Sequence, residues 1–318
     1  MSATATLPVQ PAWRLSAQPH EQRWLVTGLW AEQAVGIVGG EPKCCKSFLA
    51  LDLAVAVASG TPCLRHFSVP HPGRVLLYAA EDALHVVRAR LEGICAAAGC
   101  PLAALDVQVI TAPTLRLDLP ADRSALERTV AELQPRLLIL DPFVRLHRID
   151  ENASGEVAPL LAYLRELQRR HALSVLLVHH AKKAGAALRA GQALRGSSEF
   201  HAWGDSNLYL RRCADAISLT IEHRAAPSPP SLALELQARG EALALHIAQP
   251  PNQPAPAPTI DQRIIATLQD AASPLPINEL RSRCRVRNAT LYQRLAALTR
   301  TGRILPTPAG SRLAVVGD

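Results

Sequence analysis

The sequence predicts an α/β fold, with a mainly parallel sheet covered by helices, followed by a small α+β domain. Short apolar runs alternate with helical patterns over most of the chain, as expected for a parallel sheet. The proline-rich segment QPPNQPAPAPT, at residues 249–259, then interrupts this alternation. With 318 residues, the chain is long enough for one large domain and one small one.

The elements of the large domain follow from apolar periodicity and glycine stops. Apolar runs predict strands at residues 34–38, 74–78, 136–140 and 173–178. The last two runs are apolar throughout, which is typical of strands buried on both faces. Helical patterns predict a helix that ends at Ala58 before Gly60, a helix at 83–98 before Gly99, and a helix at 157–170. Alternating patterns at 216–222, 231–237 and 242–247 predict a terminal antiparallel meander.

The composition excludes several classes of protein. Hydrophobic residues make up 48% of the chain and aromatic residues only 4%, so the core must be mainly aliphatic. No apolar run is long enough to span a membrane, and residues 1–11 do not resemble a secretory signal. Seven cysteines without CxxC spacing fit neither a zinc site nor a disulfide framework. A cytoplasmic protein with reduced thiols is therefore expected.

A glycine-containing turn between the first strand and the first helix matches most of a phosphate-binding motif. Residues 39–47 are GGEPKCCKS, and GxxxxGK[ST] matches them at Gly40, Lys46 and Ser47 but not at Cys45. The motif directs backbone N–H groups, a lysine and a hydroxyl at phosphates and Mg²⁺. The candidate ATP-binding residues are Gly40, Glu41, Pro42, Lys43, Cys44, Cys45, Lys46 and Ser47.

Cys45 leaves more than one interpretation of this segment open. A side chain at this position can crowd the phosphates, and an unfavourable backbone conformation costs about 1–3 kcal/mol. Weak ATP binding and a purely structural turn are the alternatives to a working site. Cys44 and Cys45 are adjacent, so they are either a redox switch or two inert thiols.

Polar residues at three other strand ends support the phosphate-site interpretation. Asp141 ends an apolar strand, where it can bind Mg²⁺ together with Ser47. Glu81 follows another strand and is a candidate to polarise the attacking water. In the alternative interpretation, Asp82 caps the helix that begins at Ala83 and Glu81 only favours the dipole of that helix. His179 and His180 follow a third strand, and His180 is the candidate γ-phosphate sensor. Ligands collect at the carboxyl ends of parallel strands.

Five segments in order resemble the RecA-like ATPases of the RepA-type hexameric replicative helicase family, an AAA family ATPase group. They are GEPKCCKSFLALDLA, YAAEDALHVVRARL, LLILDPFVRLHRIDENASG, LLVHHAKK and RGSSEFHAWGDSNLYLRR. The resemblance implies a RecA-like core and a ring-forming, ATP-driven DNA motor. It implies that Glu81 is the catalytic base and that Lys46, Ser47 and Asp141 bind the phosphates and Mg²⁺. It also implies that Arg195 or Arg212 is the finger that reaches the neighbouring subunit.

A basic stretch follows the strand that ends near His180. Residues 181–196 contain Lys182, Lys183, Arg189 and Arg195 and no acidic residue. One interpretation is a loop that lines a channel for single-stranded DNA. The other is a solvated connection without such a role.

The last sixty residues carry much of the positive charge. Residues 259–318 contain nine arginines against four acidic residues, a net charge of +5, within a total of +7. Helical patterns at 261–271, 277–284 and 288–300 precede a hairpin through Arg312, which predicts a winged helix-turn-helix. Base contacts are expected from Asn288, Thr290, Gln293 and Arg294, and phosphate contacts from Arg285, Arg287 and Arg312. Winged helices also mediate protein contacts, and the excess of basic residues favours DNA binding over that alternative.

The sequence therefore predicts four regions and a DNA-related function. The regions are an N-terminal segment at 1–30, the ATPase domain at 31–248, a linker at 249–258 and the winged-helix domain at 259–318. The expected function is that of a RepA-like replicative helicase of a plasmid or mobile element. A DNA-binding regulator or initiator with a degenerate ATPase core is the alternative, and a nucleotide-binding assembly platform is a third possibility.

Overall fold

In the computed structural model, the chain forms two compact units, residues 1–248 and 249–318. The structure describes residues 9–15, 23–180, 199–213, 216–240, 242–248, 260–269, 271, 273–284 and 286–313. Each unit has its own hydrophobic core. No helix among these described residues is long and apolar enough to cross a membrane.

Nine strands from the described part of the large unit form one sheet, in the order β11-β10-β9-β8-β3-β7-β6-β4-β5. The parallel strands are β3 (Val35–Gly40), β4 (Val75–Ala79), β5 (Val107–Val109), β6 (Leu137–Asp141), β7 (Ser174–His180) and β8 (Ser206–Cys213). The antiparallel strands β9 (Ala216–His223), β10 (Leu232–Arg239) and β11 (Ala242–Ile247) extend the sheet beyond β8. The predicted α/β fold with a mainly parallel sheet is confirmed.

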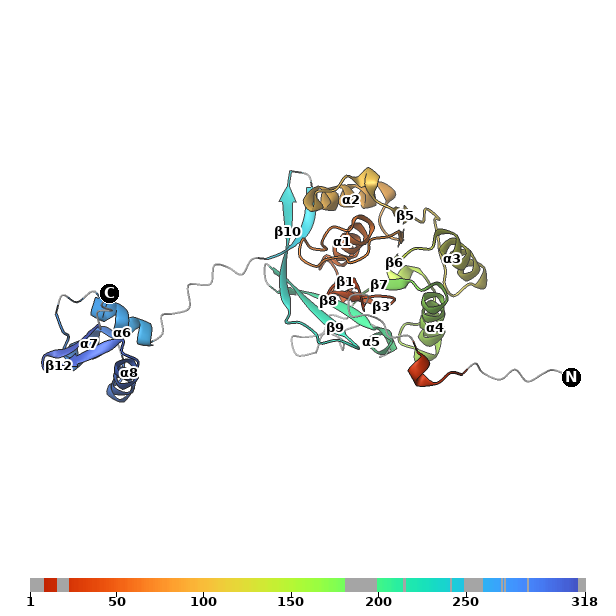
Figure 1. The fold of residues 1–318 in the computed structure, drawn as a ribbon. Coiled ribbons are helices and arrows are strands. Elements are labelled where there is room, and N and C mark those ends of the chain that lie inside the picture. Colours follow the sequence, from red (N-terminus) through yellow and green to blue (C-terminus); the bar gives the residue numbers. More distant parts are fainter. Residues whose placement is uncertain are drawn as a thin grey trace. The chain divides into compact units, whose positions relative to one another are not determined.

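Helices cover both faces of this sheet (Figure 1). The helices α1 (Lys46–Ser59) and α2 (Leu84–Ala98) pack on one face, and α3 (Pro120–Leu133) and α4 (Ser154–His171) pack on the other. Successive residues of β6 alternate between the two cores, with Ile139 in the first and Leu138 and Leu140 in the second. Burial on both sides explains why β6 and β7 are continuous apolar runs.

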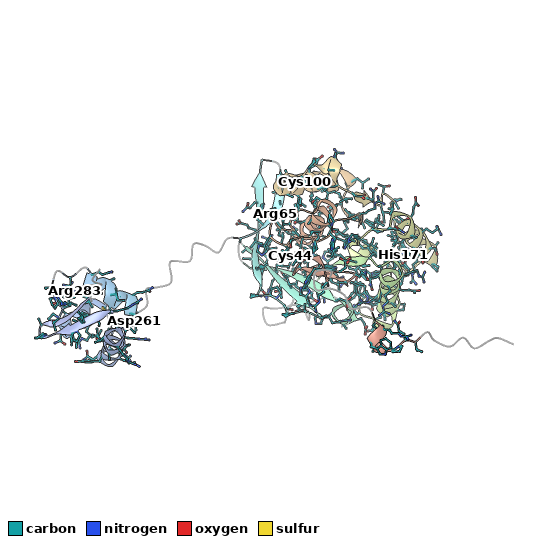
Figure 2. The ribbon with its side chains drawn as sticks, in the orientation of Figure 1. Cys44, Arg65, Cys100, His171, Asp261 and Arg283 are labelled. Atoms are coloured by element: carbon teal, nitrogen blue, oxygen red, sulfur yellow. The ribbon has the colours of Figure 1, made fainter. Side chains whose placement is uncertain are left out.

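Smaller elements complete the large unit. They are the 3₁₀ helices η1 (Ala12–Arg14), η3 (Leu102–Ala104) and η4 (Phe143–Arg145), the antiparallel pair β1 (Trp24–Val26) and β2 (Trp30–Ala31), and the short helix α5 (Glu199–Trp203). The six cysteines whose side chains are described are free thiols. Cys44 and Cys100, for example, lie at separate places in this unit (Figure 2).

The sequence prediction missed four kinds of element, for physical reasons. Helix α3 buries only Leu126 and Val130, so its apolar pattern is weak. Strand β5 has three residues, none of them fully buried, and β1 and β2 have three and two residues. Strand β8 mixes buried apolar residues with two exposed arginines, and its parallel pairing with β3 is visible only in three dimensions.

The small unit contains three helices and one hairpin among its described residues. The helices are α6 (Ile260–Gln269), α7 (Ile277–Cys284) and α8 (Asn288–Arg300), and the hairpin pairs β12 (Ile304–Thr307) with β13 (Gly310–Leu313). Its core contains Ile264, Leu280, Leu291 and Ile304. Asp261 and Arg283 mark this unit in Figure 2.

Candidate functional site

The turn between β3 and α1 has a backbone that its sequence explains only in part. At Gly40, a Cβ atom would lie 2.3 Å from the carbonyl oxygen of Leu210 and 2.6 Å from Cys44 Sγ, so only glycine fits there. Cys45 has φ 65° and ψ 28°, which is the left-handed conformation. Glycine adopts this conformation without cost, whereas another residue loses about 1–2 kcal/mol. Cys45 thus adopts a backbone conformation that is accessible to the glycine it replaces.

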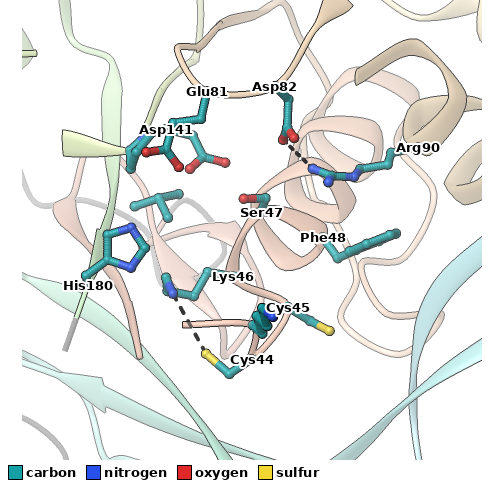
Figure 3. Close-up of a pocket in the computed structure, with 13 residues that line it drawn as sticks. Cys44, Cys45, Lys46, Ser47, Phe48, Glu81, Asp82, Arg90, Asp141 and His180 are labelled. Carbon is teal, nitrogen blue, oxygen red and sulfur yellow. Dashed lines mark hydrogen bonds and ion pairs between the residues drawn. The ribbon is translucent and has the colours of Figure 1, made fainter. Parts of the chain in front are cut away.

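The side chains of the two cysteines point in different directions (Figure 3). Cys44 is buried, and its Sγ lies 4.0 Å from Lys46 Nζ. The side chain of Cys45 is directed away from Lys46 Nζ. Burial raises the pKa of the Cys45 thiol, and Arg212, Arg90 and Lys46 oppose this shift. The interior of the turn beside the lysine is therefore occupied by Cys44 rather than by Cys45.

Lys46 is a nearly buried cation at the start of α1. Its side chain is 6% exposed, and Nζ donates a hydrogen bond to the carbonyl oxygen of Glu41 at 2.8 Å. Burial lowers the pKa of Lys46, while Cys44, Asp141 and Glu81 oppose that shift. The free N–H groups at the start of a helix attract anions, as does the lysine itself. This wall of the site is therefore suited to phosphate groups.

Carboxylates form the opposite wall. Asp141 ends β6, and burial raises its pKa to about 6, although a hydrogen bond with the Ser47 side chain opposes the shift. Glu81 and Asp82 come from the loop between β4 and α2. Figure 3 shows Glu81 and Asp141 beside each other above Ser47. Hydroxyl and carboxylate oxygens are the donors that Mg²⁺ prefers.

Two arginines that the sequence motifs did not single out contact these acidic residues. Arg145 Nε lies 2.8 Å from Glu81 Oε1. Arg90 pairs with Asp82, and its guanidinium carbon lies 5.2 Å from the centre of the Phe48 ring. The contact of Arg145 depends on which loops the sheet brings together, whereas Arg90 lies only eight residues after its partner Asp82.

The alternative in which Asp82 caps the next helix is wrong. Helix α2 begins at Leu84, and its N-cap residue is Ala83, which makes no side-chain capping hydrogen bond. The carboxylate of Asp82 faces Arg90 instead (Figure 3). Both acidic residues of this loop therefore line the cavity rather than the helix terminus.

The two histidines at the end of β7 lie in different environments. His179 is 1% exposed and stacks on Phe200, with ring centres 4.4 Å apart. His180 is partly exposed and lines the cavity with Lys46 and Asp141. Because neighbouring strand residues point to opposite faces, only one of the pair can face the cavity.

These residues surround one cavity of about 300 Å³ at the carboxyl ends of β3, β4, β6 and β7. Its lining residues are Lys43, Cys44, Cys45, Lys46, Ser47, Phe48, Glu81, Asp82, Arg90, Asp141, Pro142, Val178 and His180. The predicted site residues Lys46, Ser47, Glu81, Asp141 and His180 are all in this set. The carboxyl edge of a parallel sheet is the usual place for a ligand.

Of the two predicted arginine finger residues, the structure describes only Arg212. Arg212, in β8, donates from Nη2 to the carbonyl oxygen of Lys43 at 3.1 Å, so it contacts the turn of its own chain. Arg195 lies outside the described residues, as do Lys182, Lys183 and Arg189 of the predicted DNA loop.

The residues expected to contact DNA in the small unit also differ in their surroundings. Arg287 and Arg312 are exposed. Asn288 is exposed, and its Oδ1 accepts a hydrogen bond from Arg281 at 3.4 Å. Arg294 lies 3.8 Å from Asp261 of α6. Thr290 is half-buried on α8, while Gln293 is exposed, and Arg285 lies outside the described residues.

Comparisons with known proteins agree with the fold. A family model described as an AAA domain matches residues 2–186. The structure of a DnaB-like replicative helicase has a TM-score of 0.52 and 12% identity, with 67% of this chain and 57% of that chain covered. The crystal structure of the RadB recombinase has a TM-score of 0.49 and 15% identity, with 69% and 92% covered. At this identity the helicase structure is similar to the chain in fold.

Proposed function

The chain belongs to the AAA domain family, and from that premise we propose that it is an ATP-dependent motor that acts on DNA. In its specific form, the proposal is a RepA-type replicative helicase of a plasmid or mobile element, assembled as a ring such as a hexamer. The observation that carries the proposal is the convergence of Lys46, Ser47, Glu81, Asp141 and His180 on one cavity. A purely structural turn does not require these groups at four neighbouring strand ends.

The donor set fits ATP and Mg²⁺. The Ser47 hydroxyl, at the start of α1, and the Asp141 carboxylate, at the end of β6, share a hydrogen bond, and both are hard oxygen donors. Asp141 is 9% exposed, and a cation bound there would compensate its buried negative charge. When bound, Mg²⁺ neutralises phosphate charge and ATP supplies the phosphoanhydride bond that is cleaved.

Each residue of the chain then has a defined task. Lys46 exchanges its hydrogen bond to the Glu41 carbonyl for phosphate oxygens, and Ser47 and Asp141 hold the metal ion. Glu81 orients the attacking water and accepts its proton. His180 donates a hydrogen bond at the γ-phosphate. We assign these roles because the five side chains line the same cavity.

The ring proposal requires an arginine from a neighbouring subunit, and Arg195 and Arg212 are the candidates. Arg212 contacts the Lys43 carbonyl of its own chain, so a role in a neighbour's site requires it to leave this contact. Arg195, Lys182, Lys183 and Arg189 are proposed to face the neighbouring subunit or a single DNA strand. Mixing Arg195→Ala or Arg212→Ala chains with Lys46→Ala chains tests both arginines, because a residue acting across subunits restores turnover in the mixture.

The small unit is proposed to be a winged helix that binds duplex DNA. Arg287 and Arg312 are available for phosphates, and Asn288 and Gln293 are exposed on α8. Arg294 must exchange its contact with Asp261 before it can reach a base. Double substitution of Arg287 and Arg312 by Gln should weaken duplex binding uniformly across sequences and reduce its salt dependence by about two counterions.

The test of the motor is steady-state ATP hydrolysis by the full chain, with and without single-stranded DNA. Lys46→Ala and Glu81→Gln should each abolish the DNA-stimulated turnover. The matched control is Arg88→Gln, which removes an exposed cation that pairs with Glu92 on α2. Strand displacement on a forked duplex then distinguishes a helicase from an ATPase without unwinding activity.

A second candidate function is a DNA-binding regulator or initiator with an inactive ATPase core. The observation that favours it is Cys45, a non-glycine residue in the left-handed conformation within the phosphate-binding turn. Duplex DNA binding through residues 259–318 without any Lys46-dependent turnover would favour the regulator over the motor.

A further inference from the structure

The connection between β6 and α4 lies beside the loop that carries Glu81. A backbone hydrogen bond of 2.7 Å from Ala80 N–H to the carbonyl oxygen of Asp141 joins the two segments at their base. Farther out, Arg145 Nε, at the end of η4, donates to Glu81 Oε1 at 2.8 Å. The proposed catalytic base is therefore held by an arginine that lies 64 residues later in the sequence.

This ion pair is exposed, although the segment that carries the arginine is anchored. The side chains of Arg145 and Glu81 are 61% and 43% exposed. Phe143 and Leu146, on either side, are fully buried, so the backbone of the connection is fixed while the guanidinium lies at the surface. Exposed ion pairs contribute little to stability, so another anion can displace the carboxylate from the guanidinium.

The neighbouring pair in the same cavity is more enclosed. Arg90 and Asp82 are 26% and 29% exposed, and the guanidinium of Arg90 is also covered by the Phe48 ring. Of these two arginines, Arg145 is the more accessible to a large polyanion. Arg148, on the same connection, is also exposed and offers a matched arginine for comparison.

The contact with Arg145 occupies one oxygen of the Glu81 carboxylate. Because the guanidinium holds Oε1, this oxygen is not open to a hydrogen bond from the attacking water. Arginine also forms strong, paired hydrogen bonds with phosphate groups. A phosphate at Arg145 would therefore leave the Glu81 carboxylate available to water.

We propose that Arg145 is a positioning residue that restrains Glu81 in the absence of DNA and releases it when a phosphate group of single-stranded DNA binds the guanidinium. This inference rests on the proposed ATPase function. It assigns to one side chain the coupling between DNA binding and turnover. Removal of Arg145 should therefore make turnover less dependent on DNA.

The experiment compares native protein with Arg145→Gln, Arg145→Lys and Arg148→Gln as full chains. Turnover and KM for ATP are measured with and without saturating oligo(dT). In Arg145→Gln, the DNA-free kcat should rise about two- to fivefold, the range expected from the loss of an exposed ion pair. KM for ATP and the kcat at saturating oligo(dT) should stay unchanged. The ratio of the kcat with DNA to the kcat without DNA should therefore fall by the factor by which the DNA-free kcat rises. Arg145→Lys keeps a positive charge, so its DNA-free kcat should be lower than that of Arg145→Gln. Arg148→Gln should have the DNA-free kcat and the stimulation by DNA of native protein.

Other outcomes overturn the inference in distinguishable ways. An unchanged DNA-free kcat in Arg145→Gln shows that the pair does not restrain Glu81. A fall of kcat in both conditions shows that Arg145 supports catalysis instead, and an unchanged stimulation factor shows that DNA does not act through it. If native protein shows no ATP turnover, or only turnover that persists in Lys46→Ala, the proposed ATPase function is wrong, and the inference is wrong with it. Unfolding followed by tryptophan fluorescence establishes that each variant is folded.

Discussion

Helix α1 carries two buried charged side chains, Lys46 at its start and Asp52 less than two turns later. The surroundings of Asp52 are those of a residue that stabilises the fold, whereas the surroundings of Lys46 are those of a residue that binds a ligand. Asp52 is 2% exposed and Lys46 is 6% exposed. Both groups lose hydration on folding, and burial shifts both pKa values toward the neutral form. Their partners, however, are of different kinds.

Asp52 is paired within the fold. Its Oδ2 lies 2.8 Å from Arg65 Nη2, and its Oδ1 accepts a hydrogen bond from the backbone N–H of Leu64 at 2.7 Å. Arg65 also donates to the carbonyl oxygen of Leu245 on β11. The pair thus fixes the turn after α1, where Leu64 and Arg65 both have positive φ, and attaches it to the far edge of the sheet.

Lys46 has a neutral partner and faces a cavity. Its hydrogen bond is to a carbonyl oxygen, and the cavity beyond it is also lined by Glu81 and Asp141. A buried charge with an opposite charge in direct contact stabilises the fold it belongs to. A buried charge with an exchangeable neutral partner beside a cavity is suited to bind a ligand.

The largest expected effect on stability is that of Asp52→Ala. Removal of one partner leaves the Arg65 guanidinium half-enclosed without its carboxylate, which costs about 3–5 kcal/mol of the free energy of unfolding. Urea unfolding followed by tryptophan fluorescence measures the change in the large unit, because all four tryptophans lie within residues 1–248. The double variant Asp52→Leu, Arg65→Leu should recover part of the loss. A loss below about 1 kcal/mol would contradict a structural role for this pair.

Lys46→Ala, unlike Asp52→Ala, should reduce turnover without lowering the free energy of unfolding. Turnover should fall by about 10²–10³-fold, because a preorganised charge for the phosphates is lost. The free energy of unfolding should stay the same or rise, since a desolvated cation is removed from the folded state. ATP hydrolysis and urea unfolding of the same preparation check both expectations. A destabilisation as large as that of Asp52→Ala would show that both charges on α1 stabilise the fold to the same extent.

This comparison also shows which features can be predicted from a sequence. The phosphate-binding turn and Asp141 are local patterns, a glycine turn before a helix and a carboxylate after an apolar run, and so they were predictable. The pairing of Asp52 with Arg65 depends on an irregular turn, and no periodic pattern predicts it. Arg145 contacts the acidic loop because β4 lies next to β6, and this contact depends on strand order, which the sequence does not display. Arg90 lies only eight residues after Asp82, on the helix that follows the loop, and no motif marks their contact.

The conformation of Cys45 was also beyond sequence reasoning. A missing glycine predicts either a changed backbone or a strained one, and the sequence does not distinguish them. The structure has the strained backbone, with the side chain turned away from Lys46 (Figure 3). The difference matters because a strained turn can still present its N–H groups, whereas a rearranged turn cannot.

Cys45→Gly should therefore have the smallest effect of these substitutions. Release of the left-handed strain contributes about 1–2 kcal/mol to stability, and the greater freedom of glycine in the unfolded chain removes about 0.5–1 kcal/mol. A net gain of about 0–1.5 kcal/mol in the free energy of unfolding is expected from urea unfolding. Turnover should change by less than about threefold, because the strain is already present before ATP binds and the side chain does not face Lys46.

Cys45→Ala is the matched control, since it removes the thiol but keeps the strain. If Cys45→Gly raises turnover more than tenfold and Cys45→Ala does not, the left-handed backbone is what limits the native site. If both raise it equally, the sulfur atom itself obstructs the phosphates, although it points away from Lys46. Unchanged turnover in both variants means that the turn tolerates a non-glycine residue, because Lys46 and the start of α1 keep their places.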